Sequence, residues 1–283
     1  MRKEIKSYAK INLHLAIGPK RDDGFHDIQS IFAKIDLHDL LIIDVVESEK
    51  LKVVVNGLHN CELEGEDTIT KAIRLWCEKT RFNLCVRVNV IKNIPIKAGL
   101  GGGSSNAAYV LKTINNMYCE KSLNKKDLLD LALKVGSDVP FFIYDTTFAY
   151  VEGQGEKITP IDINFDYQIK LFKPIVGIST KGAFNKLDNI EKNTFKSKKD
   201  LIDIFKSGLE TWKVYFYNDF ELVVESEILN DLNNYNDIFS HLSGSGSTCF
   251  IIYNKNNCCY NNFTFLEKNR NNNYYNSCFF SNI

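Results

Sequence analysis

The chain has 283 residues, 44% of them hydrophobic, and its 35 basic and 35 acidic residues cancel. This length allows one large or two ordinary domains with a packed core, and the zero net charge argues against electrostatic binding of nucleic acid. The eight cysteines lack the spacing of zinc ligands, and no apolar run is as long as a membrane span. We therefore expect a cytoplasmic protein with free thiols that has neither a nucleic acid nor a membrane as partner.

The first predicted element is a strand over residues 4–17, in which apolar residues alternate with a second face carrying Lys10, Asn12 and His14. Periodicity and capping signals predict the following elements in chain order. These are strands at 28–36, 40–47 and 51–55, a helix capped by Asp67 or Thr68, a strand at 84–90, helices at 107–117 and 124–134, a short helix after Asp138, strands at 146–152 and 167–172, a helix at 219–232 and a strand at 248–253.

Strands and helices are mixed without a regular β-α alternation, which is typical of the α+β class. The pattern breaks near residues 153–162, where two glycines and Pro160 occur. We therefore predict one domain over residues 1–155 and a second over residues 156–283.

The most informative segment is a glycine-rich loop between a predicted strand and a predicted helix. It consists of Pro95, Ile96, Lys97, Ala98, Gly99, Leu100, Gly101, Gly102, Gly103, Ser104, Ser105 and Asn106. Glycines let a ligand approach the backbone, and a helix N-terminus binds anions, so the loop is predicted to cradle phosphate. No lysine follows Gly103, which excludes a Walker loop, and Ser104 stands where a dinucleotide fingerprint needs its third glycine. A glycine-rich surface turn is the structural alternative.

Three segments together resemble the three motifs of the GHMP kinases, the family of galactokinase and of the homoserine, mevalonate and phosphomevalonate kinases. They are Ala9–Asn12, Pro95–Asn106 and Leu242–Ser247. The segment Arg21–His26 is similar to the cytidine-recognition loop of one member, a kinase of the non-mevalonate isoprenoid pathway. Gly136–Pro140 and Glu152–Glu156 are similar to further landmarks of that enzyme.

The resemblance implies a two-domain GHMP kinase fold of the α+β class. Its N-terminal domain would be like ribosomal protein S5 domain 2 and its C-terminal domain ferredoxin-like. ATP with Mg²⁺ would bind the glycine loop, and the γ-phosphoryl group would pass to a hydroxyl of a small-molecule cytidine diphosphate substrate. The metal ligands and the oligomeric state stay open.

The resemblance also assigns roles to single residues. Lys10 and Asp138 would be catalytic: Asp138 would orient the attacking hydroxyl and accept its proton late, while Lys10 would offset developing charge. Substrate contacts are expected from Asn12, Phe25, His26 and Thr180, with Phe25 stacking on the pyrimidine.

Each of these residues also has a purely structural explanation. Ser104 and Asp138 are good helix N-caps, although Ser104 or Ser105 would also suit Mg²⁺ as a hydroxyl ligand. A lysine such as Lys10 on a strand face is usually solvated. Phe25 and His26 would pack their own loop, and Thr180 would lie in a β-turn.

Other functions remain as alternatives. One alternative is a GHMP kinase of the homoserine or mevalonate type, and another is a catalytically silent homologue that only binds nucleotide. An S5-like RNA-binding module is disfavoured by the zero net charge.

Overall fold

The structure is a computed structural model that describes residues 1–58, 65–144, 146–164, 167–174, 179–190, 194–224, 229, 239–254, 265–268, 274–277 and 281–282. Its contacts divide the chain into two compact units. The first unit comprises Met1–Ala9, His38–Ile96 and Gly101–Asp145, and the second comprises Lys10–Leu37, Lys97–Leu100 and Thr146–Ile283. The predicted boundary between residues 155 and 156 stays a prediction.

The elements follow in chain order. They are β1 (Arg2–Lys20), β2 (His26–Glu47), β3 (Lys52–Asn56), α1 (Thr68–Thr80), β4 (Leu84–Ile91), α2 (Gly102–Met117), the 3₁₀ helix η1 (Cys119–Lys121), α3 (Lys125–Val135), α4 (Val139–Ile143), β5 (Phe148–Gly153), β6 (Lys157–Ile161), β7 (Tyr167–Pro174), α5 (Thr180–Leu187), α6 (Lys198–Lys206), α7 (Leu209–Tyr215), the 3₁₀ helix η2 (Asp219–Leu222), β8 (Phe239–Leu242), β9 (Cys249–Asn254), β10 (Phe265–Lys268), β11 (Tyr274–Ser277) and β12 (Ser281–Asn282).

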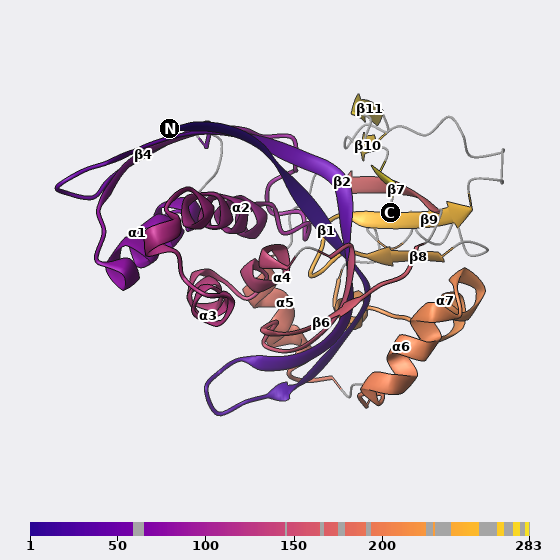
Figure 1. Cartoon of the computed structure of the whole chain (residues 1–283). Coiled ribbons are helices and arrows are strands. Elements are labelled where there is room, and N and C mark those ends of the chain that lie inside the picture. The colour runs from indigo at the N-terminus through magenta and orange to yellow at the C-terminus, as the bar shows by residue number, and fades with distance from the viewer. Residues whose placement is uncertain are drawn as a thin grey trace. The chain divides into compact units, whose positions relative to one another are not determined.

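The first unit packs helices on one face of a sheet. The second half of β2 pairs antiparallel with β4, and β3 pairs parallel with β4. Helices α1 and α2 lie side by side (Figure 1). At their contact the buried Trp76 of α1 donates its Nε1–H to Asn115 Oδ1 of α2 at 3.0 Å, so the core indole keeps a polar partner.

The second unit contains two regions of sheet. The first half of β2 pairs antiparallel with β5, which forms a hairpin with β6. A separate sheet has the order β11-β10-β7-β9-β8, with β12 also paired to β7. The rings of Phe205 in α6 and Trp212 in α7 stack 5.3 Å apart, and Trp212 meets Phe239 of β8 edge to face. These buried aromatic rings attach α6 and α7 to the sheet.

Most predicted elements are confirmed, and Asp67 caps α1 by accepting from Thr70 N. Three predictions are wrong in detail. The strands expected at 28–36 and 40–47 are the single strand β2, because the alternation of buried and exposed residues continues through Leu37 and Asp39. The hairpin partner β6 lies where a break in the pattern was expected. The segment expected to begin a helix at 219 is the short helix η2, and much of 225–232 lies outside the described residues.

The mixture of helices and largely antiparallel sheets confirms the α+β class. Within the described ranges, Cys77, Cys85, Cys119 and Cys249 are free thiols, as predicted. None of the described helices combines the length and hydropathy that crossing a membrane requires.

Candidate active site

In the first unit, the glycine-rich loop ends in the N-terminus of α2. Gly101 is the N-cap with φ of 67°, and the helix begins at Gly102. The main-chain N–H groups of Gly102, Gly103 and Ser104 therefore precede the first intrahelical hydrogen bond, which Ser105 N donates to Gly101 O at 2.8 Å. These groups and the helix dipole lie where the sequence predicts phosphate binding, and such a helix end is suited to an anion. The alternative that Ser104 is the N-cap is wrong, because the helix starts earlier.

Glycine is needed here for packing as well as for backbone conformation. This holds for Gly102, where a Cβ would lie 3.0 Å from Ile94 Cγ2; a Cβ on Gly103 would lie 3.5 Å from Thr68 Oγ1, which is an ordinary contact distance. The Ile94 segment is itself held by the buried Asp39, whose Oδ1 accepts from Asn93 N and Ile94 N at 2.8 Å. The start of α2 is therefore fixed against two neighbouring segments of the same unit.

The side chains of Ser105 and Asn106 point into the first unit and are almost fully buried. Ser105 Oγ donates to Tyr8 O at 2.5 Å, and Ser7 Oγ donates to Asn106 Oδ1 at 2.7 Å. These bonds attach α2 to β1. Ser104, which is half-buried, is consequently the better candidate of the two serines for a hydroxyl presented to a ligand.

Asp138 occupies the N-cap position of α4, but its carboxylate makes no capping hydrogen bond. The expected N-cap position is therefore confirmed, but the capping hydrogen bond of the side chain is not formed. A Cβ on Gly136 would lie 3.9 Å from Ser104 Oγ, which brings the turn that carries Asp138 next to the first turn of α2. Asp138 itself is half-buried.

In the second unit, residues 97–100 of the loop are bound to the other two motifs. Leu100 O accepts from Lys10 N at 3.0 Å, Gly99 O accepts from Ser243 Oγ at 3.0 Å, and Ala98 O accepts from Thr248 N at 3.2 Å. Gly99 has φ of 74°, and a Cβ there would lie 1.9 Å from Ser243 O. Three segments that are far apart in the sequence thus meet at one place.

Lys10 and Asn12 share one face of β1, as predicted. Lys10 Nζ donates to Asn12 Oδ1 at 2.7 Å and lies 4.5 Å from the centroid of the Phe32 ring. Lys10 is only 4% exposed, so the alternative of a solvated surface lysine is wrong. The next residue on this face, His14, stays neutral, since burial and then the charges of His241 and Lys196 lower its pKa to about 3.

In the predicted cytidine-recognition loop, Arg21–His26, the two aromatic residues have different environments: Phe25 is exposed and His26 is buried. Phe25 is 58% exposed, while the buried His26 places Nδ1 3.0 Å from Gly18 O and Nε2 3.2 Å from Asp188 Oδ1. The His26 ring stacks on Phe184 at 5.0 Å with an interplanar angle of 20°. Packing within the unit therefore explains the position of His26 but not that of Phe25.

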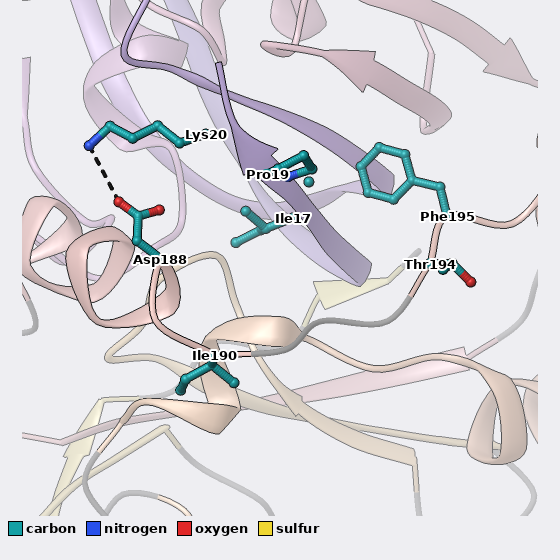
Figure 2. Close-up of a pocket in the computed structure, with 8 residues that line it drawn as sticks. Ile17, Pro19, Lys20, Asp188, Ile190, Thr194 and Phe195 are labelled. Carbon is teal, nitrogen blue, oxygen red and sulfur yellow. Dashed lines mark hydrogen bonds and ion pairs between the residues drawn. The ribbon is translucent and has the colours of Figure 1, made fainter. Parts of the chain in front are cut away.

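Sequence reasoning missed Phe184 and Asp188. They lie one helical turn apart at the end of α5, so the spacing could show that they share a face but not that this face meets His26. Asp188 also pairs with Lys20 at 3.3 Å (Figure 2). The pair borders a mainly apolar cavity of about 560 Å³. The cavity is lined by Ile17, Gly18, Pro19, Lys20, Asp188, Ile190, Thr194 and Phe195.

Thr180 is the first residue of α5, which Ser179 caps, and not a β-turn residue. Its Oγ1 lies 2.8 Å from Ser245 Oγ, in the third motif. The second unit thus connects Thr180, the third motif, residues 97–100 and Lys10 through a continuous set of contacts. Across the ranges that the structure describes, no three His, Cys, Asp or Glu side chains gather as a metal site.

Comparison with known proteins identifies similar chains. The model of the GHMP kinases N terminal domain matches residues 67–146. A 4-diphosphocytidyl-2-C-methyl-D-erythritol kinase of Pseudothermotoga lettingae is 36% identical over 258 residues, which cover 87% of this chain and 90% of the relative. The kinase of the same name from Clostridium tetani is 34% identical over 259 residues, covering 88% and 90%.

A solved structure agrees with these relatives. The crystal structure of a 4-(cytidine 5'-diphospho)-2C-methyl-D-erythritol kinase has a TM-score of 0.71 and 25% identity to this chain, covering 88% of this chain and 89% of that chain. The comparison confirms the fold that the resemblance predicts.

Proposed function

The chain belongs to the 4-diphosphocytidyl-2-C-methyl-D-erythritol kinases of the GHMP kinase family, and on this premise we propose how its residues act. The protein is an ATP-dependent small-molecule kinase. It phosphorylates the 2-hydroxyl of 4-diphosphocytidyl-2-C-methyl-D-erythritol, giving the 2-phosphate and ADP, in the non-mevalonate isoprenoid precursor pathway.

One observation supports the assignment of residues best: the hydrogen bonds that join the three motifs. Lys10 N donates to Leu100 O, and Ser243 Oγ donates to Gly99 O. Phosphoryl transfer depends mainly on positioning and on electrostatic stabilisation. A phosphate loop fixed to the strand that carries the proposed catalytic lysine meets the first of these requirements.

We propose that residues 95–106 bind ATP, with the first-turn N–H groups of α2 holding its phosphates. Mg²⁺ would accompany the nucleotide and neutralise phosphate charge. Ser104 fits as a hydroxyl ligand, because the hydroxyl of Ser105 is already donated to Tyr8 O.

We assign the chemistry to Lys10 and Asp138. Asp138 orients the 2-hydroxyl and takes its proton, and its turn lies next to the first turn of α2, since a Cβ on Gly136 would lie 3.9 Å from Ser104 Oγ. Lys10 offsets the charge that develops on the transferred group. The buried position of Lys10 strengthens this electrostatic effect, since few water molecules screen its charge.

We propose that Asn12, Phe25, His26 and Thr180 contact the substrate. The exposed ring of Phe25 offers a stacking surface for the cytosine. His26 is held by Asp188 and Phe184, which we add to the recognition site as residues that orient its ring. Since the substrate is a small molecule and the chain carries no net charge, we propose that the enzyme acts in the cytoplasm without a nucleic acid or membrane partner.

A substrate panel tests the function. ATP consumption with Mg²⁺ is measured with 4-diphosphocytidyl-2-C-methyl-D-erythritol, mevalonate and homoserine as separate acceptors. We expect turnover with the first acceptor only. Turnover with mevalonate or homoserine instead would reassign the substrate, and no turnover with any of them would leave a silent nucleotide-binding homologue.

The Phe25→Ala variant tests the base reader. We expect KM for the cytidine substrate to rise about tenfold or more, since stacking on a base contributes about 1–3 kcal/mol, while KM for ATP stays within twofold. An equal change in both constants would remove Phe25 from the site.

A further inference from the structure

Ser30 of β2 lies beside Asn12, and the direction of the Ser30 hydroxyl proton determines how the Asn12 amide is oriented. Its side chain is fully buried, and its Oγ donates to His14 O. A carbonyl oxygen can only accept, so the hydroxyl proton is committed to that bond. The lone pairs of Ser30 Oγ therefore face Asn12, whose Nδ2 lies 3.1 Å away.

This arrangement allows only one orientation of the Asn12 amide. With Nδ2 donating to Ser30, Oδ1 faces Lys10 Nζ at 2.7 Å, and an ammonium can only donate. Rotating the amide by half a turn would set its NH₂ group against the ammonium and its oxygen against the serine lone pairs. Asn12 is 2% exposed, so water does not relieve either contact.

The ammonium of Lys10 is held from a second side by the ring of Phe32, at 4.5 Å. Ser30 and Phe32 are two residues apart on β2, and Lys10 and Asn12 are two residues apart on β1. On β2, Phe32 thus contacts Lys10 directly, and Ser30 fixes the Asn12 amide that Lys10 donates to. The four side chains are buried, so water does not compete for the contacts of Lys10 with Asn12 and Phe32 or for the contact of Asn12 with Ser30.

We propose that Ser30 is a positioning residue for the reaction: through the Asn12 amide it sets the direction of the Lys10 ammonium. This role rests on the proposed catalytic function of Lys10. It extends the active site to a residue that touches neither nucleotide nor acceptor. A group that must stabilise developing charge loses effect when its position is not fixed before the reaction.

Steady-state kinetics of Ser30→Ala test the proposal. We expect kcat to fall about tenfold, the equivalent of one lost hydrogen bond of about 1.4 kcal/mol, with KM for ATP within twofold of the native value. Ser30→Thr keeps a hydroxyl at the same position and is expected to retain at least half of kcat. Ser122→Ala, which removes a hydroxyl that donates to Cys119 O at 2.8 Å, is the matched control and should leave kcat unchanged.

A double-mutant cycle separates this role from general packing. Because Ser30 acts through Asn12, Ser30→Ala should cause no further loss of kcat in an Asn12→Ala background. Independent, multiplying losses would overturn the proposal, as would a native kcat in Ser30→Ala. If Ser30→Ala fails to fold, Ser30→Cys, which nearly fills the same volume but bonds weakly, is expected to show the same tenfold loss.

A second measurement does not depend on the acceptor. Trace labelling of the folded protein with acetic anhydride and mass spectrometry reports the reactivity of Lys10, with the buried Lys170 as internal reference. We expect Lys10 labelling to rise severalfold in Ser30→Ala and not in Ser30→Thr. Lys10 labelling in Ser30→Ala that equals the native level would refute the positioning role. Inactivity of the native protein on the cytidine acceptor would instead refute only the proposed function.

Discussion

Lys97 adopts a backbone conformation that lysine seldom tolerates. Its φ of 52° lies in the left-handed region, where an L-residue with a Cβ is strained. It stands inside the segment that Lys10 and the third motif hold in place. Those hydrogen bonds balance the strain, so the loop at this residue is set by its contacts and not by its own preference.

Replacing Lys97 by asparagine is expected to stabilise the protein, because asparagine accepts the left-handed conformation more readily. A gain of about 1 kcal/mol would raise Tm by about 2–4 °C in a chain of this size. Arg81, with φ of 54° at the end of α1, offers the matched comparison outside the site. Scanning calorimetry of Lys97→Asn and Arg81→Asn gives both values, and a lower Tm in Lys97→Asn would contradict the strain argument.

At the scale of elements, the two ends of the glycine-rich loop have different structural roles. Residues 97–100 bind other segments of the second unit through their carbonyl groups, whereas residues 101–104 begin α2 in the first unit. Substitutions at the two ends should therefore have different consequences. Substitutions in residues 97–100 should lower stability, and substitutions in residues 101–104 should weaken ligand binding.

Gly99→Ala is expected to destabilise the protein by more than about 2 kcal/mol, because the new Cβ would meet a main-chain oxygen and the φ of 74° is strained. Gly65 has φ of 85° with no atom within 4 Å of its Cβ position. Gly65→Ala thus carries the strain without the collision and should cost about 1 kcal/mol. Urea unfolding of the two variants measures the difference, and equal losses would show that the contact with Ser243 is unimportant.

Gly103→Asp should abolish nucleotide binding while leaving the fold intact. The Cβ has room, at 3.5 Å from Thr68 Oγ1, and a carboxylate in the first turn suits the helix dipole. The same charge repels the phosphates. A non-hydrolysable ATP analogue at 100 times its Kd stabilises a protein by about 2.7 kcal/mol, so native protein and Gly103→Ala should gain several degrees in Tm.

Gly103→Asp should show no such gain with the analogue, although its Tm without ligand stays near the native value. A full thermal shift in this variant would place the phosphates elsewhere. Collapse of the unliganded Tm would instead mean that the first turn of α2 has no space for a side chain.

At the scale of the whole molecule, His14 contributes to the dependence of stability on pH. Its folded pKa of about 3 lies below the 6.5 of the unfolded chain, so the unfolded state binds the proton first. The resulting contribution to stability is complete above pH 6.5 and is lost as the pH falls towards 3. Its partner, Tyr217 N, donates to His14 Nδ1 at 3.3 Å, which also requires a neutral ring.

His14→Phe keeps the aromatic contacts with Phe216 and Tyr217 but cannot titrate. Between pH 7.5 and 5.5 the native protein should lose about 1.4 kcal/mol more of its unfolding free energy than the variant does. Urea titrations at the two pH values provide this comparison. An identical pH dependence of both proteins would show that His14 does not control it.

Much of this molecule is readable from its sequence, for identifiable physical reasons. The alternation of apolar and polar residues predicted β1 and the shared face of Lys10 and Asn12, because successive side chains on a strand point to opposite sides. The pairing of His26 with Asp188, and the bond from Asn12 to Ser30, join residues distant in sequence. No local pattern predicts such tertiary contacts. The start of α2 was also missed, since a run of glycines carries no helical signal.

The division of residues between the two units has a consequence for synthesis on the ribosome. Every residue of the first unit has been translated once the chain reaches Asp145, but the stretch Lys10–Leu37 belongs with segments made much later. Two of its apolar residues, Leu15 and Ile17, are buried in the finished fold in a cluster that includes Leu242 of β8 and Cys249 of β9. At about 5–20 residues per second, Leu15 and Ile17 are synthesised roughly 10–40 s before their packing partners in β8 and β9.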